Sequence, residues 1–321
     1  MNHSRDHDIT DEYRVPASLS QKRLDQAIAA LCPDYSRSQL QKWIKVGDIR
    51  VNGAIASNKS KVMLDDVISL QTTLAVQTDF QPEAIPLDMV YEDDTLMVIN
   101  KPANFVVHPA AGNWSGTLVN ALLHHNPQLQ QLPRAGIVHR LDKDTTGLMV
   151  VAKTLTAHQA LVQQLQARSV KREYLALVNA VVIAGNTIVG NIGRHPIDRK
   201  KMAVLSDAAG KAAITHYRVE SRLPLQTLLR VNLETGRTHQ IRVHLSHHKL
   251  PIVGDKTYGG RLRLAAGMKD NARQLLQHFP RQALHATKLG LIHPQTQQTC
   301  QWEVDMPMDM QQLCQSLHDP F

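Results

Sequence analysis

The densest group of polar side chains in this 321-residue sequence is the segment His139–Gly147, which reads His-Arg-Leu-Asp-Lys-Asp-Thr-Thr-Gly. It stands directly before Leu148–Ala152, a short apolar run typical of a buried strand. Polar groups at the mouth of a core element need partners or a chemical purpose. A carboxylate here could attack a substrate or transfer protons. A charged turn in which Asp142 or Asp144 braces Arg140 is the alternative on composition alone.

A second segment, residues 234–244, reads Glu-Thr-Gly-Arg-Thr-His-Gln-Ile-Arg-Val-His. Its small and hydroxyl-bearing residues predict a strand-to-helix transition with Thr238 as the helix cap. Arg237 and Arg242 are then about a turn and a half apart and point in different directions. One could face a carboxylate inside a cleft while the other meets a phosphate; two surface arginines on an amphipathic helix are the alternative.

A third segment, Lys171–Tyr174, places a tyrosine after three charged residues at the start of an apolar run. Taken alone, such a tyrosine is most often a boundary residue with its hydroxyl in water. The 20 residues 174–193 carry no charge and are long enough to span a membrane. Their glycines, asparagines and β-branched runs instead predict two strands joined by a Gly185-Asn186 turn.

The elements around these segments predict an α+β domain on a large sheet rather than a regular βαβ repeat. Strands are expected at 90–91, 96–99, 148–152, 174–182, 213–219 and 227–233, and a helix at 157–167. No GxGxxG or Walker motif is present, so a nucleotide cofactor is not indicated.

A smaller module precedes this domain. Leu24, Ile28 and Leu31 follow helical spacing, and Pro33 is expected to close that helix. Ser36 is a candidate cap for a second helix, which carries Leu40, Trp43 and Ile44 and ends at Gly47. Ile49 and Val51 then alternate before an Asn52-Gly53 turn, and residues 67–70 suggest a closing strand.

Charge is distributed unevenly over the chain, whose formal net charge is +8. Residues 14–71 hold nine Lys/Arg and five Asp/Glu, a net of +4, whereas residues 76–100 hold six acidic residues and no basic one. The basic excess favours a polyanionic partner, with an ordinary solvated face as the alternative. Residues 79–86, with Pro82 and Pro86, are typical of a linker.

Composition also excludes several classes of protein. Apolar residues make up 43% of the chain, which is enough for a packed core. Three cysteines without CxxC spacing argue against a disulfide scaffold or a cysteine zinc site, and no HExxH motif is present. Residues 1–14 contain no apolar signal segment, so we expect a cytoplasmic protein with no membrane partner and no metal.

The smaller module resembles the S4 RNA-binding domain. The resemblance rests on Arg23-Leu24-Asp25, Tyr35–Leu40 and Ile49–Gly53, whose order and spacing agree with that domain. It implies a small α/β module that grips structured RNA with two helices and a bent hairpin. The candidate RNA contacts in this module are Arg23, Arg37, Lys42 and Arg50.

The larger domain resembles the RluA-type pseudouridine synthases. The resemblance rests on segments in the family's order: His139–Asp142, Arg172–Tyr174, Gly236–Arg242, Leu250–Asp255 with Tyr258–Gly260, and Ala283–Ala286. Further segments favour the branch that modifies large-subunit (23S) ribosomal RNA: Asn100–Pro102, Val107–Pro109 with Gly112-Asn113, Gly136–His139, and Arg194–Pro196 with Met202–Val204.

This resemblance implies the chemistry of the site. Asp142 would be the catalytic carboxylate, Arg242 would pair with it and keep it ionised, and Tyr174 would stack on the target base. The reaction needs no cofactor and no metal, and members of the family mostly act as monomers. The candidate RNA contacts in this domain are Arg140, Arg194, Lys200 and Arg237.

The expected organisation is a flexible N-terminus (1–16), an S4-like domain (17–75), a linker (76–87), a catalytic domain (88–310) and a C-terminal tail (311–321). The catalytic fold would be a large mixed, mainly antiparallel sheet with flanking helices. Three alternatives stay open: the same chemistry at other 23S sites or on transfer RNA, a catalytically silent RNA-binding assembly factor, and a glycoside-type hydrolase using Asp142 and Asp144. The sequence does not choose between covalent attack and an eliminated sugar intermediate.

Overall fold

A computed structural model describes residues 7–32, 35, 37–74, 80–109, 114–206, 209–260, 262 and 264–321. The chain divides into two compact units, Met1–Asp79 and Phe80–Phe321, each with its own hydrophobic core. Among the described residues, no helix is both long and apolar enough to cross a membrane.

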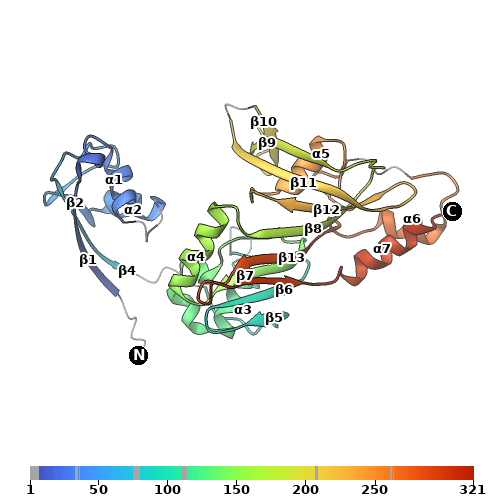
Figure 1. Cartoon of the computed structure of the whole chain (residues 1–321), viewed down its shortest axis with the longest axis horizontal. Coiled ribbons are helices and arrows are strands. Elements are labelled where there is room, and N and C mark those ends of the chain that lie inside the picture. The colour runs from blue at the N-terminus through green and yellow to red at the C-terminus, as the bar shows by residue number, and fades with distance from the viewer. Residues whose placement is uncertain are drawn as a thin grey trace. The chain divides into compact units, whose positions relative to one another are not determined.

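The smaller unit combines a four-stranded sheet with two helices (Figure 1). Its strands follow the order β1-β4-β2-β3, and every pair is antiparallel. The elements are β1 (His7–Arg14), η1 (Ala17–Leu19), α1 (Leu24–Leu31), α2 (Arg37–Val46), β2 (Ile49–Val51), β3 (Ala54–Ile55) and β4 (Val67–Leu74). Both predicted helices, the strand before Asn52-Gly53 and the closing strand are confirmed.

The packing of this unit follows from its sequence pattern. Leu24, Ile28, Leu40 and Ile44 are fully buried between the two helices and the sheet, because each recurs at helical spacing on one face. Pro33 and Ser36, the expected helix end and cap, lie outside the described residues. The expected flexible N-terminus 1–16 is not observed over 7–14: this segment pairs along its whole length with β4 as an edge strand.

The larger unit is built on one mixed sheet with the strand order β10-β9-β11-β12-β8-β13-β7-β6-β5, and β14 pairs with β13. All pairs are antiparallel except β13 with β7, so the expected large, mainly antiparallel sheet is confirmed. The strands are β5 (Met89–Glu92), β6 (Leu96–Lys101), β7 (Thr146–Ala152), β8 (Lys171–Val178), β9 (Asn186–Arg194), β10 (Met202–Leu205), β11 (Lys211–Arg222), β12 (Thr227–Leu233), β13 (Leu284–Ile292) and β14 (Thr299–Glu303).

Helices flank this sheet, as expected. They are α3 (Leu118–His125), η2 (Pro127–Gln131), η3 (Pro133–Gly136), α4 (Leu155–Gln166), α5 (Gln240–His247), α6 (Asp270–Gln277) and α7 (Met308–His318). The residues predicted as a C-terminal tail, 311–321, are instead mostly part of α7. Met310, Leu313 and Leu317 recur on one helix face and are fully buried, which anchors α7 to the core.

Two other expectations differ from the structure. The strands predicted around Gly185-Asn186 exist, but they do not form a hairpin: β8 pairs with β12 and β13, whereas β9 pairs with β10 and β11. The second half of the expected linker 76–87 belongs to the larger unit. Phe80, Ile85 and Leu87 pack against its core, and the Glu83 carboxylate accepts the Gly116 amide.

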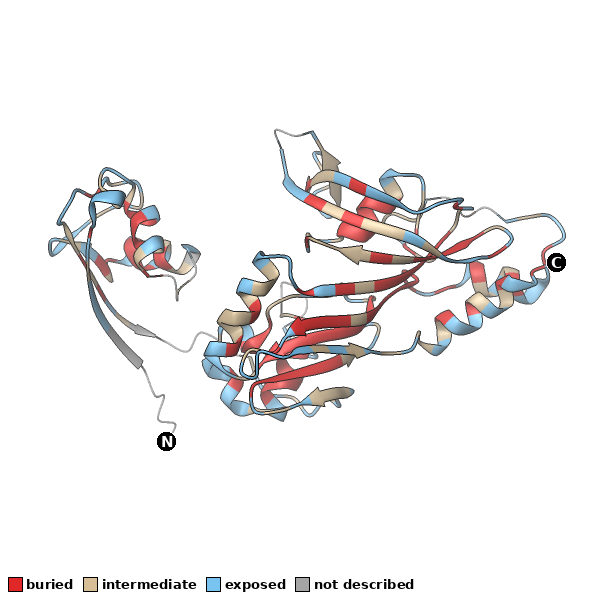
Figure 2. Ribbon diagram, in the orientation of Figure 1, coloured by how far each residue is buried: buried red, intermediate tan, exposed pale blue. Residues whose placement is uncertain are grey.

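The most buried strands lie in the middle of the sheet, and they include β7 and β8, which begin at two of the polar segments. All seven residues of β7 are buried, and β6, β8 and β13 are also largely buried (Figure 2). The parallel contact of β7 with β13 consists of Thr146 opposite His285 and Gly147 opposite Ala286. A Cβ on Gly147 would lie 2.2 Å from the Ala286 carbonyl oxygen, so this close approach requires glycine.

Candidate active site

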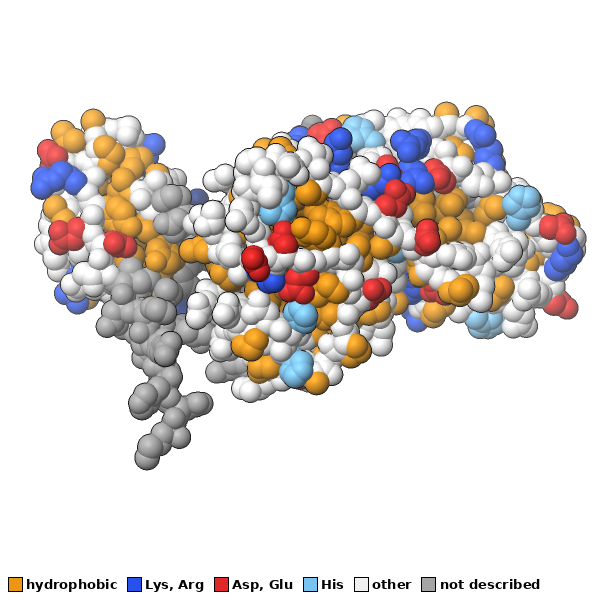
Figure 3. All heavy atoms as spheres, turned by 60° about the horizontal axis from the view of Figure 1, so that its bottom comes forward, with side chains coloured by type: hydrophobic (Ala, Val, Ile, Leu, Met, Phe, Trp, Pro, Cys, Tyr) orange, Lys and Arg blue, Asp and Glu red, His pale blue; other side chains and the backbone are white. Residues whose placement is uncertain are grey.

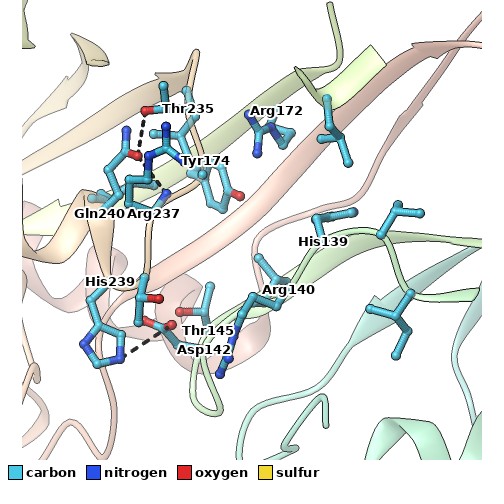
Figure 4. Close-up of a pocket in the computed structure, with 18 of the residues that line it drawn as sticks. His139, Arg140, Asp142, Thr145, Arg172, Tyr174, Thr235, Arg237, His239 and Gln240 are labelled. Atoms are coloured by element: carbon cyan, nitrogen blue, oxygen red, sulfur yellow. Dashed lines mark hydrogen bonds and ion pairs between the residues drawn. The ribbon is translucent and has the colours of Figure 1, made fainter. Parts of the chain in front are cut away.

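A pocket of about 850 Å³ opens where the three polar segments meet (Figure 4). One wall is the loop 137–145, between η3 and β7. The opposite wall consists of the start of β8 and the segment 233–242 that leads into α5. Segments about 100 residues apart in sequence therefore line one cavity.

The loop that carries Asp142 is held by backbone contacts. The buried Lys101 ammonium group donates to three carbonyl oxygens: Lys143 at 2.9 Å, Phe105 at 3.0 Å and Pro102 at 2.7 Å. Three acceptors match the three donors of a lysine side chain. The Thr145 amide donates to the Asp142 carbonyl oxygen at 3.0 Å, which closes the turn. These bonds fix the backbone and leave the Asp142 side chain directed to the pocket.

Arg242, on α5, bridges two carboxylates. Its Nη1 donates to Asp142 Oδ2 at 2.8 Å, while Nε and Nη2 donate to both oxygens of Asp255 at 2.7 and 2.9 Å. The guanidinium carbon also lies 5.0 Å from the centre of the Tyr258 ring. Arg242 is 7% exposed, so these charge-assisted bonds act in a largely dry environment.

Asp255 orients this arginine from behind. Burial opposes its ionisation, but the bonds from Arg242 and from the Thr257 and Tyr258 amides outweigh burial and lower the pKa of Asp255. For Arg242, burial lowers the pKa, yet the bonds to Asp255 and Asp142 leave it raised above the ordinary arginine value. The pair is therefore ionised, and Arg242 donates one of its three other N–H groups to Asp142.

His239 lies on the other side of Asp142. Its Nε2 is 3.8 Å from Asp142 Oδ1, and its Nδ1 is 2.9 Å from the Tyr258 hydroxyl. The Tyr258 oxygen also accepts the Met202 amide at 2.8 Å, which fixes the phenol beside the imidazole. Burial lowers the pKa of His239, which favours a neutral imidazole that adds no further charge beside the carboxylate.

The entry to α5 differs from the sequence-based expectation. Thr238 is not the helix cap: the helix starts at Gln240, and His239 precedes it with a φ of 56°. The Gln240 side-chain oxygen accepts the Arg237 amide at 2.9 Å and the Thr235 hydroxyl at 2.8 Å. This side chain satisfies the turn in place of a threonine cap, and the left-handed residue turns His239 toward Asp142.

Tyr174 lines the pocket opposite this group. It is 6% exposed, and its hydroxyl makes no hydrogen bond to any other described residue. Burial raises the pKa of Tyr174, with Asp142 adding to the rise and Arg172 opposing it. In Figure 4 the Tyr174 ring lies across the pocket from Asp142 and Arg140, so a planar group entering between them would lie next to this ring.

The candidate RNA contacts of the larger unit are dispersed. Arg140 is exposed at the pocket, and Arg237 is half-buried with its Nε donating to the Ala212 carbonyl at 3.1 Å. Arg194 is the exposed last residue of β9 and Lys200 is exposed on the following loop, where Arg194 donates to the Arg199 carbonyl. On the face drawn in Figure 3, basic and acidic side chains are interspersed over the larger unit rather than separated by sign.

The candidate contacts of the smaller unit are constrained by its own packing. Arg23 and Arg37 both bind the buried carboxylate of Asp25, at 3.0 and 2.8 Å, while 42% and 54% of their side chains stay exposed. Arg50 donates its Nε to the Gly47 carbonyl, and Lys42 is exposed on α2. The two arginines therefore carry a structural role whatever else they contact.

Sequence reasoning assigned no role to Asp255, His239, Tyr258 or Lys101. The usable signals were polar residues next to apolar runs: Gly254-Asp255 follows Ile252-Val253, and Lys101 ends the apolar strand β6. Among the described residues, no three His, Cys, Asp or Glu side chains gather into a group that could hold a metal ion. Gly112 and Asn113, quoted for the resemblance, lie outside the described residues.

Known proteins are similar to this chain in sequence and in fold. A family model for RNA pseudouridylate synthases matches residues 95–247, and an S4 domain model matches residues 22–68. The ribosomal large subunit pseudouridine synthase D of Pseudomonas aeruginosa is 53% identical over 295 residues, which cover 92% of both chains. The protein of that name from Escherichia coli K12 is 48% identical over 301 residues, or 94% of this chain and 92% of that one.

A solved structure supports the fold. The human RNA pseudouridylate synthase domain containing 4 aligns with a TM-score of 0.53 at 24% identity, over 71% of this chain and 92% of its own. The high identity to the bacterial proteins over almost the whole length carries the assignment. The chain belongs to the RNA pseudouridylate synthase family, and an S4 domain precedes its catalytic unit.

Proposed function

We propose that this chain isomerises uridines of large-subunit (23S) ribosomal RNA to pseudouridine, and that Asp142 is its catalytic carboxylate. The observation that carries the proposal is the geometry around Asp142. The carboxylate is 16% exposed to a pocket, it is held by Arg242 through one oxygen, and an aromatic ring lies opposite. The substrate assignment rests on the relatives, whose names specify the large ribosomal subunit.

The reaction breaks the bond between uracil N1 and ribose C1′ and forms a bond between C5 and the same carbon. The proton on C5 leaves, and N1 gains one, so no electrons enter or leave the substrate. A carboxylate serves this chemistry either as a nucleophile or as a proton acceptor. Arg242 acts as a fixed cationic partner that orients Asp142 as the substrate charge changes.

Tyr174 is assigned to the base. A uridine in structured RNA must leave its stack to enter the pocket, which costs a few kcal/mol. Stacking on an aromatic side chain, worth about 1–3 kcal/mol, offsets part of that cost. Because burial raises the pKa of Tyr174, its hydroxyl is protonated at neutral pH and can donate a hydrogen bond to the base.

RNA binding is assigned to both units. Arg140, Arg194, Lys200 and Arg237 would contact backbone phosphates around the pocket, and Arg23, Arg37, Lys42 and Arg50 would do so in the S4 domain. We further propose that the enzyme acts in the cytoplasm as a monomer, on stem-loop uridines of free rRNA or of an assembly intermediate.

The test is Asp142→Ala against Asp144→Asn, a change in the same loop. Each variant and the wild type are incubated with protein-free 23S ribosomal RNA, and pseudouridines are mapped by position. We expect the wild type and Asp144→Asn to modify specific uridines, and Asp142→Ala to bind the RNA without modifying it. Substantial turnover by Asp142→Ala would refute the catalytic role, and wild-type modification of transfer RNA alone would refute the substrate.

A further inference from the structure

Arg172 stands out among the pocket residues because no carboxylate of the described residues forms an ion pair with it. It lies two residues before Tyr174 on β8, on the same face of the sheet, and both line the pocket. It is 7% exposed. Burying a guanidinium this deeply costs desolvation free energy unless a counterion balances its charge and acceptors bind its five N–H donors.

The described residues supply few partners. Nη2 of Arg172 donates to the Glu234 carbonyl at a long 3.4 Å, and Nε is buried without a hydrogen bond. The two acidic neighbours in sequence and space are committed elsewhere. Glu173 points to the other face of β8 and pairs with Arg230, while the Glu234 carboxylate pairs with Arg168 and His216.

Other neighbours do not balance the charge either. His139 accepts the Val150 amide through Nε2, and burial together with Arg172 lowers its pKa to about 3, so it is neutral. The space for the guanidinium is made by Gly236, where a Cβ would lie 2.7 Å from Arg172 Nη1. In Figure 4 Arg172 lies above His139 and beside Tyr174, on the wall facing Asp142. The site thus keeps a buried cation open to the pocket.

We infer that Arg172 binds a backbone phosphate next to the target uridine. Phosphates are the anions that RNA carries, and arginine binds them with charge-assisted, often bidentate hydrogen bonds. A nucleotide stacked on Tyr174 with its ribose toward Asp142 brings its own flanking phosphates to the same pocket. The contact positions the ribose for reaction and completes the partners of Arg172. This inference rests on the proposed function, since it needs an RNA substrate in this pocket.

The experiment combines enzyme variants with single phosphate substitutions. The substrate is a synthetic large-subunit rRNA hairpin that the wild type modifies, with each phosphate near the modified uridine replaced in turn by an uncharged methylphosphonate. We expect the wild type to lose about 10-fold in kcat/KM at one flanking phosphate. Arg172→Gln should lose about 10-fold on the unmodified hairpin and nothing more at that phosphate. Its binding should also depend less on salt, by about 0.7–0.9 in the log–log slope.

The matched control is Arg168→Gln, which removes a charge at the same pocket but one already paired with Glu234. It should show the wild-type loss at the sensitive phosphate. Arg172→Lys keeps the charge without the planar group and should recover part of the lost activity, which also guards against a misfolded Arg172→Gln variant. Equal losses for wild type and Arg172→Gln at every phosphate would overturn the inference, as would a wild type indifferent to all flanking phosphates. A wild type that modifies no large-subunit RNA would instead refute the proposed function.

Discussion

Asp25 in the smaller unit and Asp142 in the larger one both bind arginine, but they use their oxygen atoms differently. The Asp25 side chain is fully buried and accepts bonds from Arg23, Arg37 and Gln41. Asp142 is held by Arg242 through Oδ2, and the Nε2 atom of the His239 imidazole lies 3.8 Å from Oδ1. The first carboxylate is saturated, whereas the second keeps acceptor capacity facing a pocket.

This difference shows how an ion pair that only supports the fold can be distinguished from one that is suited to chemistry. Charge alone does not distinguish them, because each aspartate contacts a guanidinium at 2.8 Å. What distinguishes them is the number of unused lone pairs and the space in front of them. For Asp142, a second carboxylate, Asp255, holds the arginine from behind, so the arginine is fixed without enclosing the Asp142 oxygen atoms that face the pocket.

The largest effect that tests this comparison is expected from Asp142→Asn. The amide keeps the shape but loses the charge, and isomerisation should fall by at least about 10³-fold, as for other essential reactive groups. The fold should keep its stability, because Arg242 retains Asp255 as its partner. Single-turnover rates and thermal unfolding of the same preparation measure both quantities. A large drop in unfolding temperature would show that Asp142 is structural like Asp25.

The next largest effect is expected from Asp255→Asn. Arg242 would lose its charged support, and misplacement of a catalytic group by about 1 Å can cost about 10²-fold in rate. RNA affinity should change little, because Asp255 is buried behind the arginine. A split between kcat and KM is therefore the measurement. An effect on KM alone, with kcat preserved, would show that Asp255 does not act through Arg242.

Asp25→Asn should have the opposite effect: it should lower the stability of the smaller unit and leave the isomerisation rate almost unchanged. Removing one charge of a buried pair typically costs about 3–5 kcal/mol, and the two exposed arginine tips reduce this to about 2–3 kcal/mol here. The smaller unit should unfold at lower urea concentration, measured by peptide-resolved hydrogen exchange, while the larger unit keeps its stability. Single-turnover isomerisation at saturating RNA should stay within about twofold of the wild type. A selective loss of that rate would break the comparison.

The smallest effect is a pH dependence of the smaller unit. Burial raises the pKa of Asp25, but the bonds from Arg37, Gln41 and Arg23 outweigh burial and lower it to about 2, against 3.8 ordinarily. The folded-state pKa lies below the unfolded one, so the stabilisation is present above about pH 4 and is lost as the pH falls toward 2. About 2 kcal/mol is at stake. Urea unfolding between pH 5 and pH 2.5 should show this loss in the wild type and not in Asp25→Asn.

Much of the fold was predictable because its signals are local. Helical spacing identified α1 and α2, and the apolar run of β7 identified a buried strand. The pairing of strands was harder to predict from the sequence, because β8 and β9 follow one another along the chain and yet pair with other strands. Edge strand β1 was missed because its charged residues hide the alternation, a composition that edge strands tolerate.

The site was predictable only in part, because the contacts that build it join residues far apart in the sequence. Residues 139–147 are conspicuous by composition, but nothing local links Asp142 to Arg242, and that link came from the family resemblance. Asp255 and Lys101 act through contacts that only the folded chain creates. For α7 the signal was present: Met310, Leu313 and Leu317 follow helical spacing and could have identified a packed helix.

The separation of Asp142 and Arg242 by 100 residues has a consequence for biosynthesis. A ribosome adds about 5–20 residues per second, so the arginine is synthesised roughly 5–20 seconds after the aspartate. The smaller unit, which ends at Asp79, has its own core and is complete well before either residue meets its partner. The growing chain therefore acquires its S4 domain first and the Asp142–Arg242 ion pair late, and products truncated before Arg242 retain the S4 domain without that pair.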